Sequence, residues 1–269
     1  MPRQGDASGP RRHDTTMNVL GMQTLFVKEV RRFMRVPGQT VLSPLISTTL
    51  YFIVFGYSIS GRVAEVEGSP YLHFIVPGLV FLGIANNAFL NSSSSLFITK
   101  IQGTVVDLLV APLGPGELMA GFIGGAMVRG LVVGGLTWAV AGLFTGFSLE
   151  HAWVAAYFLL IASYVFSVLG LLAAVWAEKF EQINFFPTFV MLPLTFLGGV
   201  FYSVRELPAP WSTVSLFNPM VYMVEGLRYG MLGRSAFSPA LGAGILAGVA
   251  LVATAAVYFV LRSGYRMKA

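Results

Sequence analysis

Arg129 is the one ionisable side chain that falls well inside an apolar segment of this sequence. Charged side chains are costly in a bilayer and usually mark a functional position or a paired one. Its guanidinium could contact an anionic substrate or a lipid headgroup, or it could pair with a polar neighbour. An arginine is a poor proton carrier, because it stays protonated. The acidic residues fall in tails, loops or segment ends, so the sequence offers no proton relay for ion-coupled transport.

The other polar residues form no catalytic or metal-binding pattern. None of the lysines completes the phosphate-binding sequence G-x-x-x-x-G-K-[ST], so we do not expect this chain to bind ATP by that route. There is no Cys, and the three His are far apart in the sequence. We therefore expect no catalytic residue, no metal, no cofactor on this chain and no nucleic-acid partner.

Small polar and amide side chains recur at helical spacing within two apolar segments. Ser43, Ser47 and Tyr51 share one face of the first segment, and Asn87 and Asn91 share one face of the second. Such side chains line a wet path or form hydrogen bonds between helices, and both roles stay open. Together with the intramembrane arginine they are our candidates for a translocation path.

The composition requires a bilayer to cover these segments. Of the 269 residues, 55% are hydrophobic and 11% charged, whereas a soluble domain carries about 25% charged residues. At about 20 residues per spanning helix, we expect an all-α membrane protein whose six-span transmembrane domain covers residues 38–262. The six transmembrane helices are expected at residues 38–60, 72–98, 118–145, 152–177, 183–202 and 239–261.

Glycines and prolines modify these spans. The third span contains two G-x-x-x-G pairs, which favour close helix packing; they are Gly121 with Gly125 and Gly130 with Gly134. Prolines are expected to bend or interrupt three spans. They are Pro44, Pro77, Pro187 and Pro193.

Lysine and arginine set the expected orientation. Most of these residues lie near the two ends of the chain, so both termini are predicted to be cytoplasmic, in a multi-pass protein of the cell inner (plasma) membrane. Residues 1–16 are predicted to form a disordered tail, and residues 263–269 a cytoplasmic tail. Whether Met1 or Met17 is the native start stays open.

Residues 17–37 form an amphipathic segment ahead of the first span. Its basic residues follow one stripe at helical spacing, and apolar residues occupy the other side. We predict an interfacial helix that lies in the cytoplasmic headgroup region; the alternative is a positive flank that only orients the first span. The basic stripe comprises Lys28, Arg31, Arg32 and Arg35.

The loop at residues 99–116 contains a short apolar helix that ends at Pro112. An apolar helix on the cytoplasmic side must be buried against the membrane surface or another protein. Docking of a cytoplasmic motor protein would meet that need and supply the missing energy source. The candidate docking residues are Val105, Val106, Asp107, Leu108, Leu109, Val110 and Pro112.

Residues 203–233 are apolar in pieces too short to span the bilayer. We expect two re-entrant helices between spans five and six, over residues 207–216 and 219–231, that dip into the outer leaflet. Asn218 is expected to cap the second helix, with Pro219 in its first position.

The same region supplies candidates for an outer gate. Tyr and Trp favour the headgroup boundary, and one Glu and one Arg at i, i+3 are expected to form an exposed pair of little weight. The alternative is a structural plug that never moves. The candidates are Phe201, Tyr202, Trp211, Phe217, Tyr222, Glu225 and Arg228.

At these segments the sequence resembles a known family. The best-matching stretches are QTVLSPLISTTLYFIVFG (39–56), FIVPGLV (74–80), VVDLLVAPLGPGELMAG (105–121), PTFVMLPLTFLGGVFYSVRELPAPW (187–211) and SLFNPMVYMVEGLRYGML (215–232). In their order over nearly the whole chain they resemble the permease subunit of type-2 ABC exporters, in the drug-resistance and nodulation-factor export branch.

The resemblance implies partners and roles for several segments. Two permeases, identical or paralogous, pair with each other and bind cytoplasmic ABC ATPase subunits that hold ATP and Mg²⁺. Residues 105–112 match the coupling helix that docks in the ATPase, and the interfacial helix touches the ATPase as well as membrane lipid. Residues 204–232 match re-entrant helices near the outer leaflet, and the first and fifth spans line the dimer interface.

The expected function is that of a non-catalytic transmembrane subunit of an ATP-driven exporter. Its substrate would be an amphipathic drug-like molecule, a lipid, or a glycolipid or polysaccharide, and the sequence does not choose among them. The alternative is a self-contained secondary transporter or channel, which would need an ionisable relay within the membrane.

Overall fold

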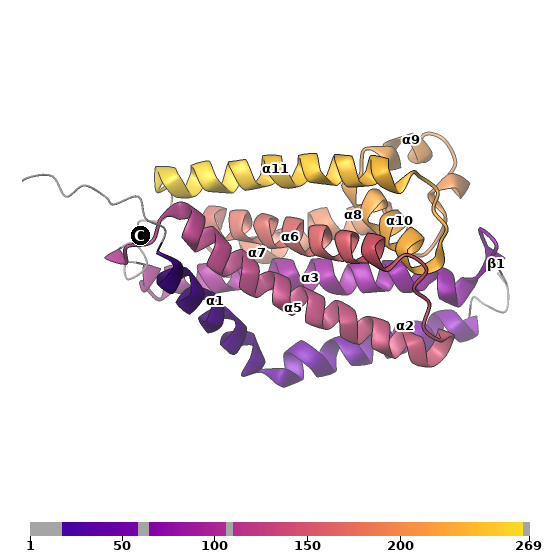
Figure 1. The fold of residues 1–269 in the computed structure, drawn as a ribbon, viewed down its shortest axis with the longest axis horizontal. Helices are drawn as coiled ribbons and strands as arrows, with labels where there is room; N and C mark the ends of the chain where they lie inside the picture. Colours follow the sequence, from indigo (N-terminus) through magenta and orange to yellow (C-terminus); the bar gives the residue numbers. More distant parts are fainter. Residues whose placement is uncertain (1–17, 59–64, 106–109, 266–269) are drawn as a thin grey trace, which may run out of the picture.

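The computed structural model describes residues 18–58, 65–105 and 110–265 of the chain. Its frame is a bundle of long helices that run along one axis (Figure 1). Four of the described helices are long and apolar enough to cross a membrane, which makes this an all-α membrane protein. They are α3 (Tyr71–Ile101), α5 (Pro115–Thr145), α6 (Ala152–Trp176) and α11 (Pro239–Ser263).

Shorter elements complete the described part of the chain. On the N-terminal side they are α1 (Val19–Met34), the π-helical turn η1 (Gly38–Leu42), α2 (Ser43–Ser58) and a small antiparallel hairpin of β1 (Glu65–Val66) and β2 (Ser69–Pro70). Between α6 and α11 they are α7 (Phe180–Phe185), the π-helical turn η2 (Phe186–Met191), α8 (Leu192–Phe196), the 3₁₀ turn η3 (Val204–Glu206), α9 (Trp211–Leu216) and α10 (Pro219–Leu232).

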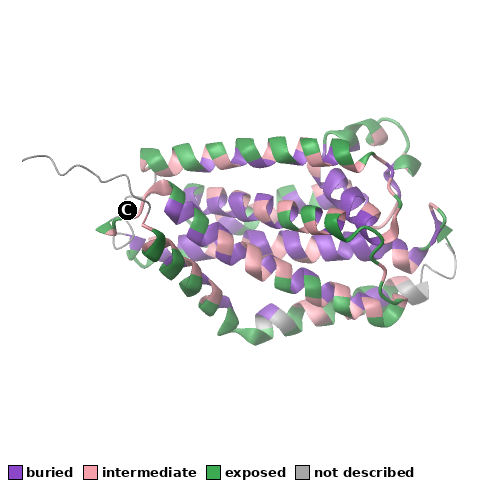
Figure 2. Ribbon diagram, viewed as in Figure 1, coloured by how far each residue is buried: buried purple, intermediate pink, exposed green. Residues whose placement is uncertain are grey.

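The core lies along α3 and α6, which are the most buried of the long helices (Figure 2). α5 covers one side of this pair and is in turn covered by α1 and α2, while α11 packs against α6 on the other side (Figure 1). α11 leaves most of its apolar surface exposed (Figure 2). In a bilayer, such a surface faces lipid or another protein subunit.

Glycines on α5 allow the neighbouring helices to approach closely, as their spacing predicts. A Cβ atom added to Gly121 would lie 2.6 Å from a side-chain carbon of Leu25 on α1. An added Cβ at Gly125 would meet Glu29, and one at Gly134 would meet Ile84 on α3. These glycines therefore set the distance of α5 from both α1 and α3.

The long apolar runs of the sequence predict the long helices well. The expected segments 72–98, 118–145, 152–177 and 239–261 correspond to α3, α5, α6 and α11. Pro77 was expected to bend or interrupt its span, and it does not interrupt the span, because α3 continues through this residue. Proline has no N–H to donate to the carbonyl four residues earlier, and its ring crowds that carbonyl, yet the packed helix around Pro77 continues.

The expected fifth helix, 183–202, differs from the structure at both ends, and most of all at its C-terminal end. The helical run begins at Phe180, passes through η2 and ends at α8, where Leu197 forms the C-cap. Gly199 then adopts φ +72, a left-handed conformation that glycine accommodates easily. Pro187 lies within the π-helical turn, as expected for a proline that disturbs the regular hydrogen-bond ladder.

Substitutions of two α5 glycines test the packing of α1 on this helix. Gly125→Ala adds a methyl group against Glu29, so we expect a loss of stability of about 1–3 kcal/mol from overpacking. Gly135→Ala is the matched control, because nothing lies within 4 Å of its added Cβ. Thermal unfolding of the purified variants in detergent measures the difference. Equal unfolding midpoints for the two variants would contradict the close contact.

Candidate functional site

A polar cavity of about 320 Å³ lies between α2, α3 and α5. Five of the six candidates for a translocation path line it, although they come from three separate helices. They are Ser43, Ser47, Tyr51, Asn87 and Arg129. The sequence pattern therefore selected residues that the fold brings together around one space.

Further polar residues of this wall escaped the sequence analysis. Asn86 and Thr48 line the cavity, and Thr137 lies two helical turns after Arg129 on the same face of α5. A single threonine in an apolar helix carries little signal in a sequence, since threonine commonly bonds to its own helix.

Asn91, the sixth candidate, lies beside the cavity and receives two arginines. Arg32 Nη2 donates hydrogen bonds to the main-chain oxygen of Asn91 at 2.9 Å and to its Oδ1 at 3.0 Å. Arg129 Nη1 lies 3.5 Å from the same Oδ1. The side-chain amide of Asn91 on α3 therefore connects α1 with α5. At this position, the polar residues form hydrogen bonds between helices.

Arg32 does not belong to the exposed basic stripe in which the sequence placed it. Its side chain turns toward the bundle, where Nε lies 3.2 Å from Oε2 of the fully buried Glu29. Lys28, Arg31 and Arg35 remain exposed, as expected. Helical spacing alone does not reveal that α1 packs on α5 through Leu25 and Glu29, which is why Arg32 was misplaced.

Buried Glu29 also corrects the expectation that acidic residues lie only in tails, loops and segment ends. The signal that could have found it is its spacing from Leu25, because these two residues meet the G-x-x-x-G pair of α5. A carboxylate completely shielded from solvent requires a positive partner, and Arg32 provides one.

Glu225 and Arg228 form a buried ion pair on α10, and each residue is 1% exposed. The expectation of an exposed pair is therefore wrong. Arg228 Nη2 also donates to the main-chain oxygen of Gly199 at 2.7 Å, and its Cζ lies 3.8 Å from the centroid of the Phe74 ring. The pair is covered by residues that are distant in sequence, which local spacing cannot show.

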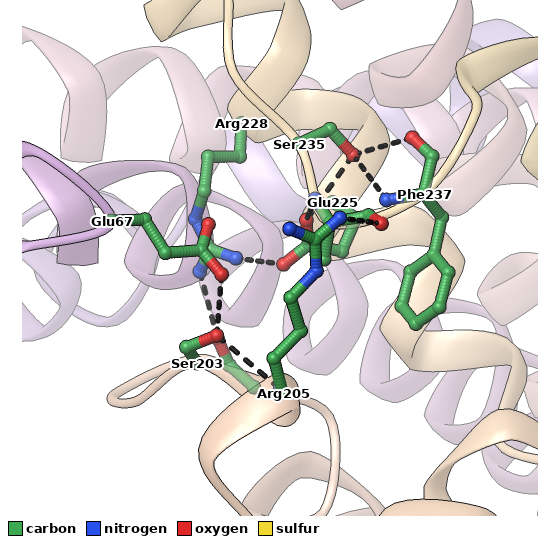
Figure 3. A network of polar contacts seen from close by, with 9 residues as sticks. Glu67, Ser203, Arg205, Glu225, Arg228, Ser235 and Phe237 are labelled. Carbon is green, nitrogen blue, oxygen red and sulfur yellow. Dashed lines mark hydrogen bonds and ion pairs between the residues drawn. The ribbon is translucent and has the colours of Figure 1, made fainter.

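Glu225 is the centre of a polar network at one end of the bundle (Figure 3). Its Oε2 accepts hydrogen bonds from Ser235 Oγ at 3.1 Å and from the main-chain N–H of Ala236 at 2.5 Å. Arg205 donates to the main-chain oxygen of Ala236 as well. The loop after α10 is thus fastened both to α10 and to η3.

The β1–β2 turn joins the same network. Ser203 donates a hydrogen bond to the carboxylate of Glu67, and Arg234 donates to the main-chain oxygens of Glu67 and Gly68. Sequence analysis missed Glu67, Ser203 and Arg234, since each lies in a short connection. What could have pointed to them in the sequence is that they belong to short polar stretches between apolar segments.

The aromatic gate candidates divide into exposed and packed residues. Trp211 and Phe217 are exposed, whereas Tyr222 is buried and its hydroxyl donates to the main-chain oxygen of Leu216 at 2.8 Å. Phe201 lies 6.2 Å from Tyr51 between ring centroids, beside the cavity wall. Tyr202 donates to the main-chain oxygen of Phe196.

The start of α10 follows the expected capping pattern. Asn218 Oδ1 accepts from the N–H of Met220 at 3.0 Å, and Pro219 occupies the first helical position. Asn218 Nδ2 also donates to the main-chain oxygen of Leu194 at 2.6 Å, which attaches α10 to α8.

Of the candidate docking residues, Val106, Asp107, Leu108 and Leu109 lie outside the described residues. Val105 is buried, Val110 is 78% exposed and Pro112 is exposed. The end of the loop is attached to the start of α1. Glu117 accepts from the main-chain N–H of Asn18 at 2.5 Å and from that of Gly114, and Asn18 Nδ2 donates to the main-chain oxygen of Pro112 at 3.2 Å.

Acidic, His and Cys side chains form no cluster suited to a metal ion within the part of the chain that the structure describes. The polar groups of this part of the chain instead form hydrogen bonds and ion pairs within an apolar helix bundle. Long apolar helices around a polar cavity define a multi-pass membrane protein of the all-α class.

The family follows from comparison with known proteins. Residues 21–232 match the ABC-2 type transporter family, and the chain belongs to it. It is 45% identical over 215 residues to the inner membrane transport permease YadH of Escherichia coli (strain K12), a match that covers 80% of this chain and 84% of that protein. It is 24% identical over 212 residues to nodulation protein J of Rhizobium leguminosarum bv. viciae, covering 77% and 80%. The family expected from the sequence is confirmed.

Removal of one partner from the buried ion pair tests its environment. Arg228→Met leaves the Glu225 carboxylate uncompensated, so we expect a loss of roughly 3–5 kcal/mol in stability. The double variant Glu225→Gln/Arg228→Met should recover part of this loss. Arg262→Gln, at an exposed position near the end of α11, removes the same charge and should change stability by less than about 0.5 kcal/mol. Equal thermal unfolding of the Arg228 and Arg262 variants in detergent would contradict the buried pair.

Proposed function

We propose that this chain is the non-catalytic permease subunit of an ATP-driven exporter in the inner membrane. The observation that carries the proposal is the family match from residue 21 to residue 232, which includes α1, the loop at 99–116, the cavity and α10. ATP and Mg²⁺ would bind to a separate cytoplasmic ABC ATPase subunit. The printed name of the relative YadH, an inner membrane transport permease, supports both the location and the transport role.

The proposed topology has six spans. Besides the four long helices, η1 with α2 would form the first span, and the run from α7 to α8 the fifth. At 1.5 Å per residue, the run Phe180–Phe196 is about 25 Å long, somewhat shorter than a typical hydrocarbon core of about 30 Å. α9 and α10 are too short to cross and would lie as re-entrant helices in the outer leaflet.

Both termini would then be cytoplasmic. The start of α1 and the end of α11 lie at the same end of the bundle, whereas the β1–β2 hairpin and α9 lie at the opposite end (Figure 1). The exposed basic residues of α1, Lys28, Arg31 and Arg35, would face anionic lipid headgroups and the ATPase.

The partner in the membrane would be a second copy of the chain or a paralogous permease. α2 exposes Ile46 and Leu50, and the fifth span exposes Phe189 and Phe196. These apolar surfaces suit a helix interface within the bilayer as well as contact with lipid. The cavity beside α2 would then lie close to the route of an amphipathic drug-like molecule, a lipid, or a glycolipid or polysaccharide.

In this proposal the polar network around Glu225, at the outer end of the bundle, acts as the gate. The aromatic gate candidates lie in the connection after α8, in α9 and its C-cap, and in α10; they are Phe201, Tyr202, Trp211, Phe217 and Tyr222. Arg228, which pairs with Glu225, attaches α10 to this connection through Gly199. Movement of α10 would have to break buried polar contacts, which favours two discrete positions over gradual displacement.

Cysteine labelling tests the topology, and the chain is suited to it because it has no native Cys. Gln102→Cys at the end of α3 and Glu206→Cys in η3 both place the thiol at exposed positions. A membrane-impermeant maleimide should label position 206 in right-side-out vesicles and position 102 only in inside-out vesicles. The opposite result at either position would rule out six spans with cytoplasmic termini.

Reconstitution with a cognate ABC ATPase tests the function itself. Together, the two proteins in liposomes should hydrolyse ATP and export substrate. Val110→Asp places a charge on the exposed apolar side chain of the loop and should weaken ATPase binding at least about tenfold, since one such buried side chain contributes about 1.5–3 kcal/mol. Gln102→Asp adds the same charge in the same loop without removing an apolar group. Equal loss in both variants would exclude docking through Val110.

A further inference from the structure

Arg129 gives the polar cavity a charged wall. It is the one charged residue among the described residues that line this space, and the rest of the wall is amide, hydroxyl or apolar. The contact of Arg129 with Asn91 does not neutralise its charge, because Asn91 offers only the dipole of its amide oxygen. A ligand in the cavity therefore meets a positive guanidinium.

Charge in the surrounding cluster is unbalanced. Arg32 and Arg129 converge on one oxygen of Asn91, at 3.0 and 3.5 Å. Glu29 is the carboxylate of this cluster, and its contact at 3.2 Å is with Arg32. Two guanidinium groups therefore face one carboxylate. An uncompensated positive charge is unfavourable in surroundings of low polarity, and an anion beside Arg129 would relieve it.

Donor groups around the cavity also lack acceptors. Arg129 Nε, Asn91 Nδ2 and Thr137 Oγ1 are buried atoms with no hydrogen-bond partner among the described residues. Thr137 is 2% exposed and lines the cavity. The amide orientation of Asn91 is fixed by the two arginines that donate to its oxygen, which leaves its NH₂ group as a donor. Arg129 and Thr137 line the cavity, so a ligand that satisfies these two side chains must supply acceptor oxygens.

Phosphate has this chemistry, since it combines negative charge with several strong acceptor oxygens and pairs readily with arginine. The cavity, at about 320 Å³, lies at the lower limit of the roughly 300–1,000 Å³ typical of small-molecule sites. It would hold a headgroup and leave the chains of an amphiphile outside, next to the apolar helices.

We infer that this cavity binds a phosphate group, with Arg129 as the charged ligand and Thr137 as a hydroxyl donor. The phosphate would belong to the headgroup of an amphiphile or to a free ion. The inference that a phosphate-bearing amphiphile is the exported substrate rests on the proposed function. Phosphate binding itself can be measured without transport.

Calorimetric titration of the full chain in dodecyl maltoside, a detergent without phosphate, tests the inference. The probes are short-chain phosphatidic acid, inorganic phosphate and a diacylglycerol of equal chain length. Arg129→Gln should weaken binding of phosphatidic acid at least about tenfold, and Thr137→Val should weaken it several-fold. Arg262→Gln, the matched loss of one exposed charge, should leave binding unchanged. Thermal unfolding of each variant confirms that it is folded, and the isosteric Thr137→Val keeps the test available if Arg129→Gln does not fold.

The outcomes separate the sources of the phosphate and the two proposals. Binding of phosphatidic acid alone supports a lipid headgroup, and comparable binding of inorganic phosphate supports the free ion. Equal binding of the diacylglycerol, or equal loss in the Arg129 and Arg262 variants, overturns the site. Absence of phosphate binding together with intact ATP-driven export overturns this inference and leaves the proposed function standing. Phosphate binding without any ATP-driven transport supports the binding site and rules out the proposed function as an exporter subunit.

Discussion

The contact between α1 and α5 determines much of what surrounds the cavity. Two glycines on α5 leave room for Leu25 and Glu29, so α1 approaches until its buried carboxylate lies within the protein. A carboxylate in that position needs a cation, and Arg32 turns inward to supply it. Arg32 in turn reaches Asn91 on α3, beside Arg129. The charged cluster beside the cavity thus follows from how closely two helices pack.

A second buried pair plays the corresponding role at the opposite end of the bundle. Glu225 and Arg228 lie one turn apart on α10, yet their other contacts are with segments distant in sequence. These contacts include Gly199, Ser235, Ala236 and the Phe74 ring. Breaking such a pair by loss of one member is strongly unfavourable, whereas the intact pair contributes little net stability. Its effect is to hold several connections in one arrangement.

The sequence was sufficient to predict the elements whose local pattern is strong. Uninterrupted apolar runs located α3, α5, α6 and α11, and the Asn218–Pro219 cap located the start of α10. Helical spacing also found four of the polar residues that line the cavity, since residues on one helix face stay together wherever the helix packs. They are Ser43, Ser47, Tyr51 and Asn87.

What could not be predicted depends on contacts between distant segments. Spacing alone did not show which face of α1 meets protein, so Arg32 was expected at the surface and Glu29 was overlooked. Likewise Glu225 and Arg228 were expected to be exposed, because Phe74 and Gly199, which cover the arginine, lie far away in the sequence. The early end of α8 reflects the positive φ of Gly199, a backbone feature that glycine permits without requiring it.

The attachment of Glu117 to Asn18 has a mechanical consequence. α1 is one unbroken helix of 16 residues, about 24 Å long, with the loop end fastened at its first turn and Arg32 in its last. A helix without a kink behaves as a stiff rod along its axis. A push or pull on the loop at Pro112–Gly114 is therefore delivered to the other end of the helix, where Arg32 holds Asn91 beside the cavity.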